Sequence, residues 1–172
     1  MRAGRTRAYI GLGSNLDHPA RQLEIALTAL AALPGTTLVA RSRLYRNPPL
    51  GPPDQPDYVN AVAAIDTDLA PLALLDGLQS IESAQGRVRD GSRWGPRTID
   101  LDLIAYGAAT IDLPGLKVPH PGLAARNFVL IPLHEIAPDV AIPGHPPLAA
   151  LIAALDGGQL VPLSADPSPF AG

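Results

Sequence analysis

Two aspartates two residues apart, Asp100 and Asp102, lie in an apolar stretch that is expected to form a strand over residues 99–106. Because strand side chains alternate between faces, both carboxylates point to one face and Leu101 points to the other. Their backbone positions lie roughly 6.6 Å apart at two strand rises. Hard oxygen ligands suit Mg²⁺, so the pair could hold two magnesium ions. Phosphate oxygens of a ligand would complete the coordination of these ions. An amphipathic strand with a solvated acidic face would show the same pattern, although aspartate is disfavoured in strands.

Four arginines precede this strand in a segment that carries glycines at 86, 91 and 95. They are Arg87, Arg89, Arg93 and Arg97. Guanidinium groups bind phosphate oxygens bidentately, and a glycine-bearing segment can close over a ligand. A solvated loop would explain the arginines equally well. Arginines beside paired aspartates are nevertheless what a polyphosphate with bound Mg²⁺ requires, because the metals neutralise some oxygens and the arginines the others.

A third feature is the loop over residues 47–57, which carries prolines at 48, 49, 52, 53 and 56. These prolines prevent strand pairing and stiffen the loop. Tyr58 and Asn60 follow on one face of the next expected strand, and an aromatic ring beside an amide suits a flat polar heterocycle. A rigid connector followed by an ordinary core tyrosine is the alternative.

Several common chemistries lack their motifs. The chain has no cysteine, which excludes a thiol nucleophile and a cysteine-type zinc site. It contains no G-x-x-x-x-G-K-[ST] sequence, and the glycines at 11 and 13 lack the third glycine of a dinucleotide fingerprint. Residues 11–15 are therefore interpreted as a structural turn. The histidines have no H-E-x-x-H spacing, and Ser14 has no G-x-S-x-G setting.

The elements that must position these residues follow from apolar periodicity and turn signals. Strands are expected at 7–12, 37–45, 58–65 and 99–106, and helices at 18–33 and 71–84, with a short further helix at 148–155. The order strand, helix, strand, strand, helix, strand is the split βαβ pattern. We predict an α+β ferredoxin-like sandwich with a mainly antiparallel sheet and flanking helices. One domain is expected over 1–160 and a loose tail over 161–172.

Composition limits the partners. The 172 residues are 47% hydrophobic and 17% charged, with a formal net charge of −3. A folded domain is expected, and the acidic balance argues against a general nucleic-acid binder. No apolar run approaches the roughly 20 residues that span a bilayer. We therefore expect a cytoplasmic protein, a monomer, that contacts neither membrane nor nucleic acid.

Seven segments, in order along the chain, resemble the 6-hydroxymethyl-7,8-dihydropterin pyrophosphokinase family. They are AYIGLGSNL (8–16), YRNPPLG (45–51), QPDYVN (55–60), QGRVR (85–89), RWGPRTIDLDLI (93–104), VPH (118–120) and RNFVL (126–130). The resemblance extends over about 8–155, and the run at 93–104 is its most specific part. It implies a ferredoxin-like enzyme of folate biosynthesis that transfers diphosphate from ATP, with two Mg²⁺ ions, to the hydroxymethyl pterin and releases AMP.

The resemblance also implies roles for individual residues. Asp100 and Asp102 match metal ligands and, with Arg87 and Arg97, the catalytic set. Positions around the pterin match Asn47, Pro48, Leu50, Tyr58, Asn60, Trp94, Asp100 and Phe128, of which Asn47 and Leu50 act through their backbone. Positions around ATP match Gln79, Glu82, Arg89, Arg93, Trp94, Leu103, Lys117, His120 and Arg126. Gly115, Lys117 and Pro121 depart from the family pattern, and Lys117 is expected to supply a positive charge that is missing there.

Two other functions fit part of the pattern. Ferredoxin-like domains often bind RNA, and arginines beside aromatic rings could hold a single strand, although net acidity and the aspartate pair oppose this. An ATP-dependent kinase acting on a different heterocyclic alcohol would need the same phosphate-binding residues. Only the segment 47–60 distinguishes it, and that segment favours the pterin.

Overall fold

A computed structural model describes residues 5–15, 18–47, 57–85, 99–155 and 160–163 of the chain. Its strands are β1 (Thr6–Ser14), β2 (Thr36–Arg41), β3 (Tyr45–Asn47), β4 (Tyr58–Thr67), β5 (Asp100–Tyr106), β6 (Ile111–Leu113), β7 (Leu116–Val118) and β8 (Val161–Pro162). Its helices are α1 (Pro19–Ala31), α2 (Pro71–Ala84), α3 (Asn127–Ile136) and α4 (Leu148–Ala153), with a 3₁₀ turn at Leu123–Ala125. No helix of these described ranges is long and apolar enough to cross a bilayer.

The main sheet has the strand order β5-β1-β4-β3-β8, and β2 also pairs with β4. Every pairing in it is antiparallel. Since β2 and β3 follow one another along the same edge of β4, they are two parts of one interrupted strand. The four strand positions then have the order of the split βαβ pattern. The predicted ferredoxin-like α+β sandwich, with its mainly antiparallel sheet, is confirmed.

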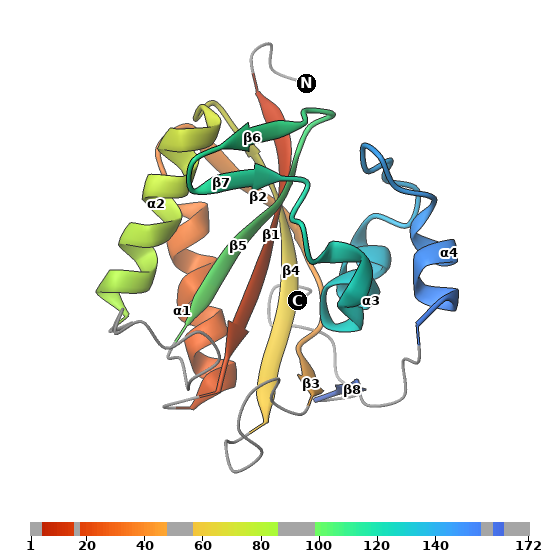
Figure 1. Cartoon of the computed structure of the whole chain (residues 1–172). Helices are drawn as coiled ribbons and strands as arrows, with labels where there is room; N and C mark the ends of the chain where they lie inside the picture. The colour runs from red at the N-terminus through yellow and green to blue at the C-terminus, as the bar shows by residue number, and fades with distance from the viewer. Residues whose placement is uncertain (1–4, 16–17, 48–56, 86–98, 156–159, 164–172) are drawn as a thin grey trace.

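Helices cover both faces of this sheet (Figure 1). On one face, α1 and α2 pack their apolar stripes against β1, β4 and β5 around a core that includes Leu27, Leu78 and Leu101. On the other face, α3 and α4 pack on residues such as Val62 and Ile104. The sheet is therefore buried from both sides, and its central strands can carry functional side chains only where a helix does not cover them.

Strand β1 is longer than predicted. It runs to Ser14, so the interpretation of residues 11–15 as a turn is wrong for Gly11 to Ser14. Gly11 and Gly13 pair with β4 on one side and β5 on the other. The ladder hydrogen bonds to two neighbouring strands outweigh the weak strand preference of glycine.

The expected strand over 37–45 is interrupted at Ser42. The Ser42 N–H donates to the Val62 carbonyl, and the Val62 N–H donates to the Ser42 hydroxyl at 3.0 Å. The side chain thus takes the place of a backbone partner, and the edge strand divides into β2 and β3.

Within the described residues, the prediction missed one helix, one 3₁₀ turn and three short strands. Helix α3 forms although Pro132 lies inside it, because Leu130 and Leu133 are buried against the sheet. The hairpin β6–β7 follows β5. Val161 and Pro162, in the expected loose tail, pair with β3 as β8, while residues 164–172 lie outside the described part of the chain.

Candidate active site

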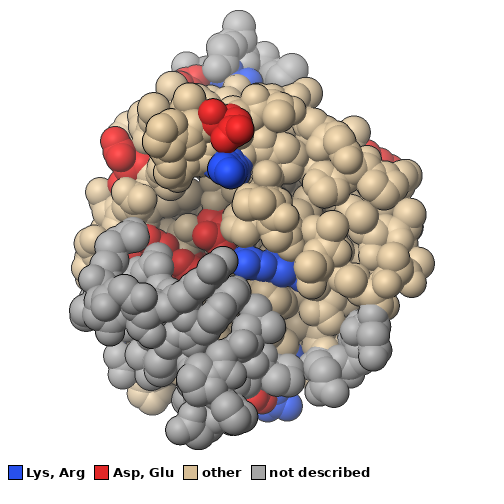
Figure 2. All heavy atoms as spheres, in the orientation of Figure 1, with Lys and Arg blue, Asp and Glu red and all other residues tan. Residues whose placement is uncertain are grey.

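Asp100 and Asp102 lie at the start of β5, opposite two glycines. Asp100 pairs with Gly13 of β1 and Asp102 pairs with Gly11. Directly paired residues face the same side of a sheet, so both carboxylates stand over the glycine positions. Both aspartates are half-buried, whereas Leu101 between them is buried in the core beneath α1 and α2. Figure 2 shows acidic side chains in a hollow near the middle of the face seen in Figure 1, with basic side chains close to them.

The glycines make a stretch of β1 without side chains between β5 and β4. A Cβ on Gly13 would lie 2.9 Å from Asn60 Oδ1, and a Cβ on Gly11 would lie 3.2 Å from Ile104 Cδ1. Across β1 from Asp100, Gly13 also pairs with Asn60 of β4. The aspartate pair and Asn60 therefore face one another across bare backbone. The sequence analysis did not predict that the glycines leave this space between the aspartates and Asn60, although their spacing of two residues was the available signal.

Asn60 is held by a second asparagine. Its Nδ2 donates a hydrogen bond to Asn47 Oδ1 of β3. Asn60 is only 5% exposed, and Asn47 is only 6% exposed. Tyr58 pairs with Asn47 across β3 and β4 and is half-buried. Asn47, Tyr58 and Asn60 thus lie together on the face that carries the aspartates, and the side-chain contact of Asn47 is an addition to its predicted backbone role.

His120 reaches the aspartates from the segment after β7. Its N–H donates to the Ile104 carbonyl at 2.9 Å, and its Nδ1 accepts a hydrogen bond from the Gly122 N–H at 3.0 Å. Its other ring nitrogen, Nε2, lies 4.0 Å from Asp102 Oδ2. Burial lowers the pKa of His120, and the charge of Arg126 lowers it further, while Asp100 acts in the opposite direction. At neutral pH the ring is therefore uncharged and directs its Nε2–H toward the carboxylate.

Arg126 and Phe128 lie at the start of α3. The Arg126 guanidinium stands over the Phe128 ring, 5.8 Å from its centroid. Both side chains are half-buried. A cation, a ring and the His120 imidazole are thus contributed from the segment that enters α3 and from the turn before it.

The other described residues of the predicted ATP set have different environments. Glu82 of α2 is 2% exposed, and its Oε2 accepts a hydrogen bond from the Leu101 N–H at 2.8 Å, whereas Gln79 of the same helix is exposed. The Leu103 side chain is buried in the core on the face opposite the aspartates. Lys117 is exposed on β7, where it pairs with Asp112. The predicted residues Pro48, Leu50, Arg87, Arg89, Arg93, Trp94 and Arg97 lie outside the described residues.

The carboxylates of Asp100 and Asp102 suit a magnesium ion that is bound together with a phosphate ligand. Within the described ranges, no group of three or more His, Cys, Asp or Glu side chains could hold a metal ion. Asp100 and Asp102 instead supply two carboxylates on one open face. Mg²⁺ is commonly bound by one or two carboxylates together with waters and substrate phosphates, so this pair suits a metal that arrives with a phosphate ligand.

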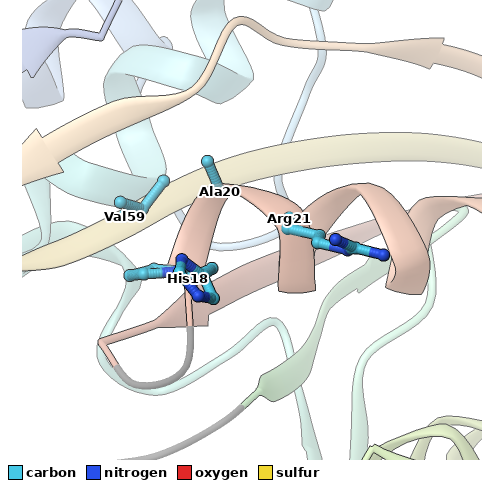
Figure 3. A pocket seen from close by; sticks show the side chains of 5 residues that line it. His18, Ala20, Arg21 and Val59 are labelled. Atoms are coloured by element: carbon cyan, nitrogen blue, oxygen red, sulfur yellow. The ribbon is translucent and has the colours of Figure 1, made fainter.

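A separate pocket of about 450 Å³ lies at the start of α1 (Figure 3). It is lined by His18, Pro19, Ala20, Arg21 and Val59. Val59 belongs to the core beneath α1 and α2, so this pocket is on the other face of the sheet. Among the residues that the structure describes, none of those predicted for the site lines it.

The fold and this face define a ferredoxin-like α+β protein that presents paired carboxylates, an amide and an aromatic ring around bare backbone. Residues 9–138 match the family 7,8-dihydro-6-hydroxymethylpterin-pyrophosphokinase. The chain belongs to this family, as its sequence predicts, and it is an enzyme of the pyrophosphokinase class.

Relatives of known name agree with this assignment. The 2-amino-4-hydroxy-6-hydroxymethyldihydropteridine pyrophosphokinase of Pseudomonas aeruginosa is 57% identical over 148 residues, which are 86% of this chain and 91% of that protein. The enzyme of the same name from Haemophilus influenzae is 49% identical over 157 residues, 91% of this chain and 98% of that protein. A crystal structure of wild-type Plasmodium falciparum HPPK-DHPS with pteroate superposes with a TM-score of 0.69 at 14% identity, over 87% of this chain. The chain spans only 42% of that longer protein, and the likeness bears on the fold alone.

Proposed function

We propose that this chain transfers the terminal diphosphate of ATP to the hydroxymethyl group of 6-hydroxymethyl-7,8-dihydropterin, releasing AMP, and that it does so on the face around Gly11 and Gly13. The observation that carries the proposal is that the glycine backbone of β1 separates a pair of carboxylates from an amide. The carboxylates of β5 lie on one side of β1 and Asn60 of β4 lies on the other. Two interstrand spacings, roughly 9.6 Å, separate them, which leaves room for a flat ring whose substituent points toward the carboxylates.

The pterin side of the site consists of Asn60 and aromatic rings. The Asn60 amide offers both a donor and an acceptor, and these suit the edge of a heterocycle that presents the complementary groups. Tyr58 and Phe128 enclose the ring plane between β4 and α3, and aromatic faces stack well on flat ligands. Asn47, Pro48, Leu50 and Trp94 complete this side.

The phosphate side consists of the aspartates and the surrounding cations. Asp100 and Asp102 would hold two Mg²⁺ ions, which supply positive charge to the phosphate oxygens when bound. Arg126 adds a guanidinium, and His120 adds a ring N–H next to Asp102. The further ATP contacts come from Gln79, Glu82, Arg89, Arg93, Trp94, Leu103 and Lys117. Because the Leu103 side chain is in the core, its contribution comes from main-chain atoms.

Catalysis depends on positioning and charge. The pterin hydroxyl oxygen attacks the β-phosphorus of ATP in line, and the bond from that phosphorus to the oxygen of the α-phosphate breaks. Asp100, the aspartate that pairs with Gly13, lies nearest the hydroxymethyl group. Arg87 and Arg97 stabilise the charge that develops on the transferred group once both substrates are enclosed. The enzyme acts as a monomer in the cytoplasm.

The test is incubation of the purified chain with ATP, Mg²⁺ and 6-hydroxymethyl-7,8-dihydropterin, followed by separation of the products. We expect AMP to form in equal amount with the pterin diphosphate. An Asp102→Asn variant, prepared in parallel, controls for contaminating kinases. Production of ADP and a pterin monophosphate would contradict the proposal and indicate a simple kinase.

A further inference from the structure

Two neighbouring groups of the protein restrict the orientation of the Asn60 amide, one on the β3 side and one on the β1 side. On the β3 side, Asn47 Oδ1 accepts the hydrogen bond from Asn60 Nδ2. On the β1 side, Asn60 Oδ1 lies where only a glycine leaves space, since a Cβ on Gly13 would approach it to 2.9 Å. Real Cβ atoms essentially never approach this closely, so something must shift when a methyl group is added at Gly13, and the atom that it meets is the amide oxygen at the end of the Asn60 side chain.

The described residues next to the amide on β3 are buried. Asn47 and Asn60 are both buried, and the residue opposite Asn60 on β3 is Tyr45, which is 3% exposed. Interiors are packed at close to crystal density, so a shift at Gly13 is transmitted to the next side chain rather than absorbed. Rotation of the amide away from Gly13 would also remove the Asn47 hydrogen bond, because that bond fixes the direction of Nδ2.

We propose that Gly13 and the Asn47 side chain are positioning residues that set the orientation of the Asn60 amide and thereby determine which edge of a flat heterocycle the enzyme accepts. The inference rests on the proposed function, in which Asn60 binds the pterin edge. Asn47 commits Nδ2 to one side, so the amide offers the ligand a fixed arrangement of donor and acceptor. If the amide could rotate so that its oxygen and nitrogen exchange places, it would accept a ring with the opposite arrangement of donor and acceptor as readily.

The experiment measures binding, so that it does not depend on turnover. Calorimetry gives the affinity of 6-hydroxymethylpterin in the presence of Mg²⁺ and a saturating non-hydrolysable ATP analogue, and separately the affinity of the analogue. The variants are Gly13→Ala, Asn47→Ala and Asn60→Ala, with the double variant Gly13→Ala/Asn60→Ala. Gly77→Ala is the control, because it adds the same methyl group at a glycine of α2 outside the site, where the methyl group meets Leu33 Cδ2 at 3.1 Å rather than Asn60.

Loss of one buried neutral hydrogen bond should weaken pterin binding about 3- to 10-fold in Asn47→Ala. Gly13→Ala should weaken it about as much as Asn60→Ala, whereas Gly77→Ala should stay within about twofold of the unmodified chain. If Gly13 acts through Asn60, the double variant should bind the pterin no more weakly than Asn60→Ala alone. The ATP analogue should bind all five variants with little change.

Two results would overturn the inference: unchanged pterin affinity in both Gly13→Ala and Asn47→Ala, or losses in the double variant that add up as independent effects. If Gly13→Ala does not fold, as judged by its thermal unfolding, the result for Asn47→Ala decides. Failure of the unmodified chain to bind the pterin at all would instead reject the proposed function, and this outcome is distinguishable because it appears before any substitution is made.

Discussion

Tyr45 forms a hydrogen bond between β3, the strand that carries Asn47, and α3, the helix that begins next to Phe128. The contribution of this contact to the free energy of unfolding can be predicted. The Tyr45 hydroxyl donates to Glu135 Oε1 at 2.5 Å, and the Arg43 N–H donates to Glu135 Oε2 at 3.0 Å. The Arg43 guanidinium also donates to the Tyr45 hydroxyl at 3.1 Å. Burial raises the pKa of Tyr45, and the hydrogen bond to Glu135 raises it further, so the hydroxyl remains a donor at neutral pH.

The perturbation is Tyr45→Phe, which keeps the buried ring and removes only the hydroxyl. A hydrogen bond to a charged acceptor contributes about 1.5–3 kcal/mol. The Glu135 side chain is 27% exposed, and it keeps its bond from the Arg43 N–H, so water and Arg43 compensate in part. We therefore expect the free energy of unfolding to fall by about 1.5 kcal/mol, the lower end of that range.

Urea denaturation followed by fluorescence measures the effect. With a slope of about 1–3 kcal/mol per molar urea, the midpoint should fall by roughly 0.5–1.5 M while the slope stays the same. Glu135→Ala alone and together with Tyr45→Phe completes a double-mutant cycle. An unchanged midpoint in Tyr45→Phe, or a coupling energy near zero in the cycle, would refute the reasoning that this contact holds β3 against α3.

Three further predictions concern the site. Asp102→Asn should remove most turnover while the melting temperature changes little, because the carboxylate supplies charge to bound metal rather than to the core; normal turnover would reject its metal role. Arg87→Ala and Arg97→Ala should lower the single-turnover rate far more than ATP affinity, and Lys at either position should restore only part of it; a loss confined to ATP affinity would make both arginines ordinary binding residues. His120 has a lowered pKa in the folded chain, so the unfolded chain takes up the proton first as pH falls below about 6.5. Stability should therefore decline between pH 7 and pH 5 more steeply in the unmodified protein than in His120→Gln, and equal slopes would contradict the burial of a neutral ring.

Much of the fold was predictable because it depends on local patterns. Apolar residues at helical spacing, such as Leu23, Leu27 and Leu30, identify α1, and α2 follows from the same argument. Strand alternation places Asp100 and Asp102 on one face without any knowledge of their neighbours. These inferences need only the periodicity of one element, which the sequence contains in full.

The features that escaped prediction depend on neighbours distant in sequence. Gly11 and Gly13 look like a turn locally, and only pairing on both sides makes them strand residues. Pro132 argues against a helix, yet burial of the surrounding apolar residues stabilises α3. The hydrogen bond between Asn47 and Asn60 joins two strands across the proline loop. A single sequence contains no periodic signal for any of these contacts.

The two-residue strand β8 has a consequence for self-association. The outer edge of a short strand such as β3 carries backbone groups that can pair with another chain and begin edge-to-edge aggregation. Val161 pairs with Arg46 and Pro162 pairs with Tyr45, so β8 covers this edge, and the Leu163 N–H donates to the Leu44 carbonyl at 3.0 Å just beyond it. Proline has no N–H to offer, which makes β8 itself a poor template for a further strand. A chain shortened before residue 160 would expose the edge of β3 and should be less soluble at high concentration.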